Sequence, residues 1–176
     1  MAKNAPDGED VDAAVLILLS GKPPYVLLVR KSCTDASPWA CDIAFPGGRV
    51  KRGETPEETA VREAWEEAGV WPGYVRVIAR LPVHRTRLRG IRVLPVIGRV
   101  SGPVEARVRS SEVDQVIWVR LEDLWGKEPG TIMHPRRGPV RGVMLGDDMV
   151  LWGLTLRILN SLREALGRLQ AQGGLT

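Results

Sequence analysis

The chain has 176 residues, of which 44% are hydrophobic and 26% charged, so we expect one globular domain with its own core. It contains neither an apolar run long enough to span a membrane nor a basic segment followed by a signal-peptide core, and we expect a cytoplasmic protein that does not partner with membranes. The net charge of +4 and the pI near 9.4 favour small anionic ligands such as nucleotides, whereas nucleic acid is not expected because no basic run with interleaved aromatic residues is present.

The first part of the chain predicts strands around a tight turn. Residues 1–10 are polar and are expected to form a frayed tail before a single domain at 11–172. Aliphatic runs predict strands at 11–19 and 25–30, and a polar loop at 31–40 leads to a short strand at 41–45. Cys33 and Cys41 flank this loop without the spacing of a zinc or redox motif, so we expect free thiols rather than a disulfide.

The next element is a helix whose two ends are well marked. Thr55 can cap the first turn, Pro56 suits the first helical position, and Glu58 completes a capping box. Gly69 is expected to end the helix in the left-handed conformation. Alanines at every fourth position form a stripe that can pack closely on a sheet (Ala60, Ala64, Ala68).

Three glutamates share one face of this helix. Glu63, Glu66 and Glu67 are three and four residues apart, so their charges repel one another unless a cation lies between them. Hard divalent ions such as Mg²⁺ and Mn²⁺ prefer carboxylate oxygens. Arg62 can reach Glu66 one turn on, or fold back toward Glu54, and so hold the cluster in place. The alternative is a solvated acidic face, but the combined spacing of glycines, cap, loop glutamate and arginine favours a metal site.

The second half predicts further strands and two helices. Strands are expected near 74–80, 83–89, 91–100 and 113–119, followed by a short helix at 121–125 and a Gly/Pro/Arg-rich loop at 126–142. The final helix is expected to begin near Asp147 or Asp148 and to bury an apolar stripe (Leu151, Leu154, Ile158, Leu162, Ala165, Leu169). These elements predict an α/β fold of mixed α+β type, with a mixed sheet between two principal helices.

Residues 48–70 carry the most specific motif of the chain. They read GRVKRGETPEETAVREAWEEAGV and fit G-x5-E-x7-R-E-U-x-E-E-x-G-U, where U is aliphatic. This stretch resembles the signature box of the Nudix hydrolases. The resemblance implies an α/β/α sandwich, an Mg²⁺ or Mn²⁺ cofactor, and hydrolysis of a nucleoside diphosphate derivative, in which water attacks phosphorus while cations neutralise charge.

The resemblance also implies roles for individual residues. Glu63 and Glu67 are the expected metal ligands, and the main-chain carbonyl of Gly47 often joins the metal shell in this family. Glu66 is expected either to bind metal or to activate water, with Glu54 and Arg62 supporting the catalytic centre. Family members differ over which glutamate is the base, and some recruit one from a later loop. Glu112 is the candidate for this second arrangement, and the alternative for it is a surface loop residue.

Substrate class depends on segments outside the box. Three segments are similar to the coenzyme A diphosphatase branch of the family: the first is 27–32 leading to 38–39 and then 43–48, the second is 90–98, and the third is 151–159. The stretch 37–41 (Ser-Pro-Trp-Ala-Cys) lacks the arginine, histidine and glycine that this branch carries before its Phe-Pro-Gly-Gly. The alternatives are therefore hydrolysis of ADP-ribose or ADP-sugars, dinucleotides or nucleoside triphosphates, or a non-catalytic nucleotide-sensing domain. Such sensing domains usually lose box carboxylates, which this chain retains.

Several residues are candidates for substrate contacts. Arginines alternate on the expected strand at 83–89, where they form either a phosphate cradle or a solubilising face (Arg85, Arg87, Arg89). Arg30 could reach a phosphate or pair with an acidic neighbour. Trp39 could stack on adenine or anchor its loop to the core. No spacing indicates ligand roles for His84 or His134, so both are expected to be surface or loop residues. Helix packing is expected for Trp152 and Thr155. The sequence leaves open whether the protein is a homodimer.

Overall fold

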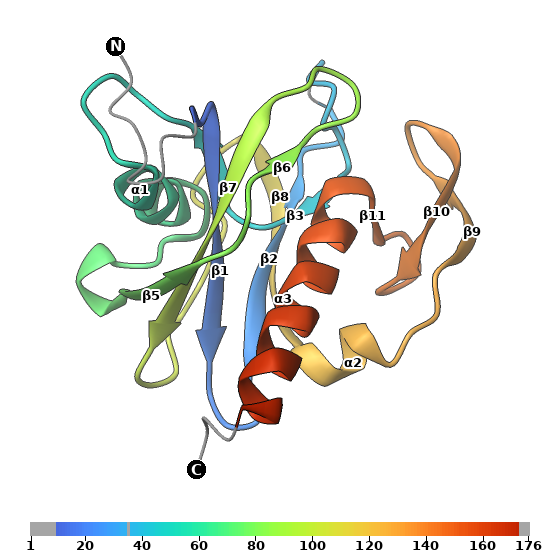
Figure 1. The fold of residues 1–176 in the computed structure, drawn as a ribbon. Helices are drawn as coiled ribbons and strands as arrows, with labels where there is room; N and C mark the ends of the chain where they lie inside the picture. The colour runs from blue at the N-terminus through green and yellow to red at the C-terminus, as the bar shows by residue number, and fades with distance from the viewer. Residues whose placement is uncertain (1–9, 35, 173–176) are drawn as a thin grey trace.

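The computed structural model describes residues 10–34 and 36–172, so the expected tail at 1–10 lies outside the described residues except for Asp10. An eight-stranded mixed sheet forms its centre (Figure 1). Its strands are β1 (Ala13–Ser20), β2 (Tyr25–Lys31), β3 (Ile43–Ala44), β4 (Gly47–Arg49), β5 (Arg76–Arg80), β6 (His84–Arg85), β7 (Arg92–Val100) and β8 (Val113–Arg120). Among the described residues, β1 and β7 pair in parallel, whereas the other strand pairs of this sheet are antiparallel.

Helices and a second, smaller sheet complete the fold. The helices are α1 (Pro56–Ala68), the 3₁₀ turn η1 (Pro72–Tyr74), α2 (Leu121–Trp125) and α3 (Gly153–Ala171). The smaller sheet contains β9 (Gly130–His134), β10 (Gly138–Met144) and β11 (Val150–Trp152). Among the described residues, no helix combines the length and apolar character needed to cross a membrane.

The large sheet lies between two hydrophobic cores. α1 covers one face and α3 the other, with α2 at one end of α3 (Figure 1). Side chains of β2 alternate between them, because successive residues of a strand point to opposite faces. Leu27 and Val29 belong to the core beneath α1, whereas Val26 and Leu28 belong to the core beneath α3. This arrangement confirms the predicted α/β/α sandwich with a mixed sheet.

The ends of α1 follow the prediction from the sequence. Thr55 Oγ1 accepts a hydrogen bond from the Glu58 amide at 3.1 Å, and the Glu58 carboxylate accepts one from the Thr55 amide at 2.7 Å. Gly69 ends the helix with φ of 69°, in the left-handed region. The alanine stripe is fully buried against the sheet. Local signals therefore predicted this helix correctly.

Three predictions for the second half are wrong. The expected strand at 83–89 stops at Arg85, because Thr86 and Ile91 close a tight turn through the Thr86 amide and the Ile91 carbonyl at 2.9 Å. The expected loop at 126–142 forms the β9–β10 hairpin instead. α3 begins at Gly153, since the residues before it pair with β10 as strand β11.

The predicted stripe of α3 changes at both ends. Leu151 is buried on β11 rather than on the helix, and Leu169, near the end of α3, is 47% exposed. Ile158 and Leu162 are buried as predicted.

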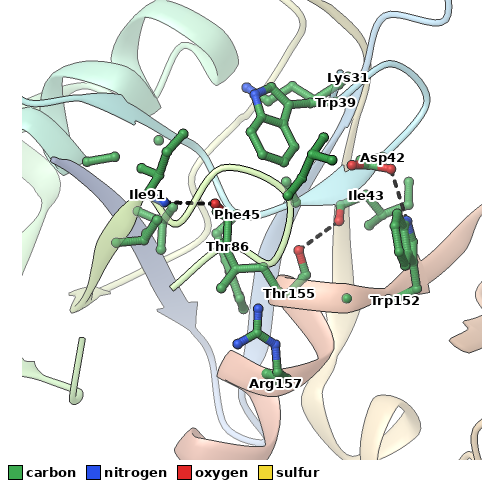
Figure 2. Close-up of a pocket in the computed structure, with 18 of the residues that line it drawn as sticks. Lys31, Trp39, Asp42, Ile43, Phe45, Thr86, Ile91, Trp152, Thr155 and Arg157 are labelled. Carbon is green, nitrogen blue, oxygen red and sulfur yellow. Dashed lines mark hydrogen bonds between the residues drawn. The ribbon is translucent and has the colours of Figure 1, made fainter. Parts of the chain in front are cut away.

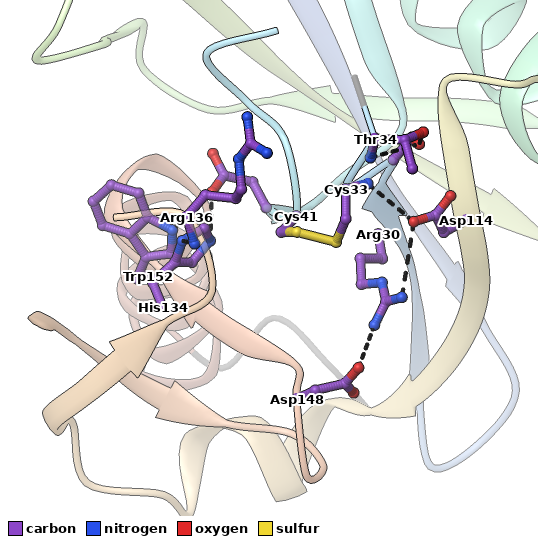
Figure 3. The surroundings of a disulfide bond; sticks show 11 residues. Arg30, Cys33, Thr34, Cys41, Asp114, His134, Arg136, Asp148 and Trp152 are labelled. Carbon is purple, nitrogen blue, oxygen red and sulfur yellow. Dashed lines mark hydrogen bonds and ion pairs between the residues drawn. A yellow bond between two sulfur atoms is a disulfide. The ribbon is translucent and has the colours of Figure 1, made fainter. Parts of the chain in front are cut away.

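The expectation of free thiols is also wrong. Cys33 and Cys41 form a disulfide, with their Cα atoms 4.5 Å apart (Figure 3). Antiparallel pairing of β2 with β3 brings the two ends of the loop together, and the Cys41 amide donates to the Lys31 carbonyl at 3.2 Å. Separations of this size are within the range that disulfides bridge. Cysteine spacing in the sequence does not contain this strand pairing, which is why it predicts free thiols.

Candidate metal and diphosphate site

Glu67 projects from α1 into the protein rather than into solvent. It shares the sheet-facing side of the helix with the alanine stripe, and its side chain is only 2% exposed. One carboxylate oxygen accepts a hydrogen bond from the Gly47 amide at 3.3 Å, and the other forms an ion pair with the Lys31 ammonium. Burial raises the pKa of Glu67, and Lys31 opposes this rise. Such burial is the opposite of a solvated acidic face.

Glu63 reaches the same short strand, β4. A methyl group on Gly48 would lie 2.7 Å from Glu63 Cδ and closer still to Oε1. Real side-chain contacts do not come this close, so only glycine leaves room for the carboxylate at this position. Gly47 is equally constrained, since a methyl group there would lie 2.8 Å from Val15 Cα on the paired strand β1. The Gly-Gly pair thus brings two carboxylates together against one stretch of backbone.

Arg62 binds the loop glutamate and the helix glutamates at once. Its Nε donates to Glu54 at 2.6 Å, and Nη1 donates to Glu63 at 2.9 Å and to Glu66 at 3.0 Å. The two alternatives for Arg62 are therefore realised together. Hydrogen bonding from Arg62 lowers the pKa of Glu54 to about 2. Thr59 adds a hydroxyl donor to Glu54 at 2.7 Å, so this carboxylate is held as an anion.

The residues of this site fit one hard divalent cation. Within residues 10–34 and 36–172, no three Asp, Glu, His or Cys side chains lie close enough to enclose an ion by themselves. Mg²⁺ often uses only one or two carboxylates and completes its shell with water and substrate phosphates. Glu63 and Glu67 provide two carboxylates on one side. A cation would stabilise the ionised form of the buried Glu67 most, because burial disfavours a charged carboxylate. Glu66 is 47% exposed and is tied to Arg62. Gly47 contacts this site through its N–H, which donates to Glu67, and a metal contact of its carbonyl stays a prediction.

A cavity of about 260 Å³ adjoins β4 (Figure 2). Gly47, Gly48 and Lys31 contribute to its wall beside the glutamates. Most of the remaining wall is apolar, with arginines at several points (Trp39, Ile43, Phe45, Leu88, Ile91, Trp152, Leu154, Arg87, Arg137, Arg157). A diphosphate held at Glu63 and Glu67 would therefore have a largely apolar cavity next to it for one of its attached groups.

Asp42 is a polar feature of this wall that sequence reasoning missed. Its Oδ1 accepts a hydrogen bond from Trp152 Nε1 at 2.9 Å, and His134 Nε2 lies 3.0 Å from the same oxygen. Burial raises the pKa of Asp42 and lowers that of His134. His134 is thus a buried partner of a cavity carboxylate rather than a surface residue. Trp152 lies on β11, not on the last helix, and its hydrogen-bond partner Asp42 is more than 100 positions away in sequence.

The predicted substrate contacts separate into two groups. Trp39 and Arg87 line the cavity, although Arg87 lies in the turn after Thr86 rather than on a strand. Arg85 does not line it, and its carbonyl accepts a hydrogen bond from Arg157 at 2.8 Å. The three arginines therefore do not form one strand face.

Arg30 and Glu112 lie away from this cavity. Arg30 pairs with Asp148 at 2.7 Å and approaches Asp114 at 3.8 Å (Figure 3). This acidic pairing was one of its two predicted alternatives. Glu112 is exposed in the turn before β8, and its main-chain carbonyl accepts a hydrogen bond from the Ser32 amide at 2.9 Å.

Known proteins are similar to this chain in sequence and in fold. The NUDIX domain family model matches residues 9–140. An uncharacterized Nudix hydrolase, NudL, from Escherichia coli is 32% identical over 161 residues, covering 88% of this chain and 82% of the relative. A Nudix hydrolase from M. smegmatis, RenU, has a TM-score of 0.64 at 20% identity and covers 94% of this chain and 93% of its own. The NUDIX domain of Shewanella oneidensis NrtR, solved with ADP-ribose, has a TM-score of 0.57 at 19% identity, covering 92% and 93%. The chain, with its intact glutamate box on α1, belongs to the Nudix hydrolase family.

Proposed function

We propose that this Nudix diphosphatase hydrolyses a nucleoside diphosphate derivative with the help of Mg²⁺ or Mn²⁺, and that coenzyme A or one of its derivatives is the leading substrate. The observation that carries the proposal is the meeting of Glu63 and Glu67 at Gly47–Gly48, directly beside an apolar cavity. The diphosphate would bind to the cation that these glutamates hold, and a group attached to the diphosphate would enter the cavity.

Each part of the site has a role in this reaction. The bound cation would neutralise the charge that develops on the phosphates as water attacks. Glu63 and Glu67 would hold that cation, and Arg62 would keep Glu63 and Glu66 at fixed positions through its hydrogen bonds. Glu66 is the preferred general base, because its half-exposed carboxylate is open to water. Glu112 is second, since it is exposed in the turn before β8 and does not line the cavity beside the glutamates.

The choice of coenzyme A is supported by where its sequence resemblance lies in space. Residues from all three similar segments line the same cavity, including Phe45 from the first, Ile91 from the second and Trp152 from the third. Sequence segments that meet at one cavity are the ones expected to determine which ligand binds there. ADP-ribose is the second candidate, because the fold relative NrtR binds it. Dinucleotides, ADP-sugars and nucleoside triphosphates complete the set.

A substrate panel tests the proposal. The protein is incubated with Mg²⁺ or Mn²⁺ and with coenzyme A, ADP-ribose, NADH or a nucleoside triphosphate, and the products are separated by chromatography. Coenzyme A should yield an adenosine 3′,5′-bisphosphate and a phosphopantetheine half. If nothing in the panel is hydrolysed, the enzyme proposal fails and a nucleotide-sensing role becomes the better account. If ADP-ribose is preferred, the substrate assignment alone fails.

Substitution of single glutamates then assigns the roles. Glu67→Gln should lower the rate by at least ~10², the usual loss when one electrostatic stabiliser is removed. Glu164→Gln, at an exposed position of α3, is the matched control and should leave the rate unchanged. Comparison of Glu66→Gln with Glu112→Gln identifies the base, since only the variant lacking the base should lose the acidic limb of the pH–rate profile, where protonation of the base lowers the rate.

A homodimer remains part of the proposal. Edge strand β5 exposes apolar side chains, with Val77 at 38% and Ile78 at 51%, and exposed edges of this kind can pair with a second chain. Light scattering of the wild type and of Ile78→Lys would show whether such a dimer forms.

A further inference from the structure

Lys31 links the candidate metal site to the cavity. Its ammonium forms an ion pair with Glu67, and the two side chains are only 19% and 2% exposed. Lys31 also lines the cavity, where Figure 2 shows it beside Trp39. The same ammonium is therefore within reach of a carboxylate that would hold a cation and of the space that a substrate would fill.

The position of Lys31 follows from strand alternation. Lys31 is the last residue of β2 and continues the series of Leu27 and Val29, which point toward α1. Arg30 belongs to the opposite series and points toward Asp148. The pairing of β2 with β8 shifts register between Arg30 and Lys31 without returning Lys31 to the other face, as its contact with Glu67 on α1 shows.

Lys31 and a divalent cation would compete for one carboxylate. A Glu67 oxygen engaged by the ammonium is less available as a metal ligand, and two cations at one shielded carboxylate repel each other. Lysine carries a flexible stem and a rotatable ammonium, so it can change partners without rearrangement of the backbone. The nearest new anion would be the diphosphate of a substrate bound at the cavity.

We propose that Lys31 is an exchangeable counter-ion: it neutralises Glu67 in the metal-free protein, and it moves to the substrate diphosphate once Glu67 ligates a divalent cation. The inference rests on the proposed function, because it assumes that Glu67 is a metal ligand. Lys31 then prevents an unpaired charge at Glu67 before the cation binds, and it contributes to substrate binding afterwards.

Mn²⁺ binding without substrate tests the first half, with free Mn²⁺ measured by electron paramagnetic resonance. Lys31→Met keeps the aliphatic stem and removes the competing charge, so it should bind Mn²⁺ at least about tenfold more tightly than wild type, as expected for one lost charged hydrogen bond. Lys31→Arg should bind Mn²⁺ more weakly, because a guanidinium can hold a carboxylate through two parallel hydrogen bonds. Arg30→Met is the matched control: it removes one charge from the adjacent residue on the opposite face and should leave the affinity unchanged.

ADP binding at saturating Mg²⁺, measured by calorimetry, tests the second half. Lys31→Met should weaken it by about tenfold, again the effect of one charged contact, whereas Arg30→Met should not change it. Equal Mn²⁺ affinity in wild type and in Lys31→Met would overturn the competition, and unchanged ADP affinity in Lys31→Met would overturn the transfer. If Lys31→Met does not fold, the Lys31→Arg result decides: Mn²⁺ affinity equal to or above wild type overturns the inference. Failure of wild type itself to bind Mn²⁺ would instead overturn the proposed function together with the inference.

Discussion

Replacing Gly48 by alanine should lower activity, whereas replacing Gly47 by alanine should lower stability. At Gly48 the new methyl group would lie 2.7 Å from Glu63 Cδ, so the carboxylate must move by roughly 1 Å to reach ordinary contact distance. The carboxylate is the end of a flexible side chain, and the fold should lose only about 1 kcal/mol. A displacement of this size at a reaction centre typically costs ~10² in rate. Gly48→Ala should therefore fold and should lose most of its activity.

At Gly47 the new methyl group would clash with main-chain atoms of β1, which cannot move aside by rotating a side chain. The new methyl group would lie 2.8 Å from Val15 Cα, so β4 would have to separate from β1. Gly47→Ala should consequently lose about 1–3 kcal/mol of unfolding free energy or more. Gly102→Ala is the control, because a methyl group there meets nothing within 4 Å.

Three measurements on these variants check the reasoning: thermal unfolding, Mn²⁺ affinity, and turnover of whichever substrate the panel identifies. The expected order of melting temperatures is Gly102→Ala, Gly48→Ala, Gly47→Ala, from highest to lowest. Wild-type turnover and Mn²⁺ affinity in Gly48→Ala would refute the proposal that Glu63 must stay at this position to bind the cation. A wild-type melting temperature for Gly47→Ala would refute the close approach of β4 to β1.

Other changes test contacts around the site and the fold. Arg62→Lys keeps a charge but loses the fork that holds three carboxylates, so metal affinity or turnover should fall about 10–100-fold, measured by Mn²⁺ titration and kinetics. Hydrogen bonding from Arg92 lowers the pKa of Asp12 to about 2 from 3.8, so its contribution to stability is present above pH about 4 and is lost as pH falls toward about 2. Asp12→Asn should flatten this part of the pH dependence of urea unfolding, and an unchanged slope would contradict the assignment. Cys33→Ser opens the loop closed by Cys41 and should cost about 2–3 kcal/mol, visible as a lower melting temperature that reductant reproduces in wild type but not in the variant.

Local signals predicted α1 well because its structure depends on near neighbours. A cap three residues from its partner, a proline in the first turn and a glycine at the end are all readable within a few positions. The glutamate spacing likewise placed Glu63 and Glu67 close together. Their surroundings were not readable in this way, since the Gly47 amide and the Lys31 ammonium come from other strands.

The errors share a physical cause, which is pairing between distant segments. The disulfide depends on β2 meeting β3, and the late start of α3 depends on β11 meeting β10. The sequence of the β9–β10 hairpin predicts a loop, because glycine and proline have low strand propensity. Tertiary pairing decided these elements against local preference.

The alternation of side chains along β2 contains information about the position of Lys31. Once β2 is predicted as a strand, period-2 alternation assigns Leu27, Val29 and Lys31 to one face and Arg30 to the other. The helix that carries the glutamates covers one of these faces, and the basic residue at the end of that face lies near the helix. In the structure this residue is Lys31, which forms an ion pair with Glu67. The choice between Arg30 and Lys31 therefore depends only on which face α1 covers. That question is settled by which alternate series of β2 packs beneath the alanine stripe of α1, and Leu27 and Val29 do so.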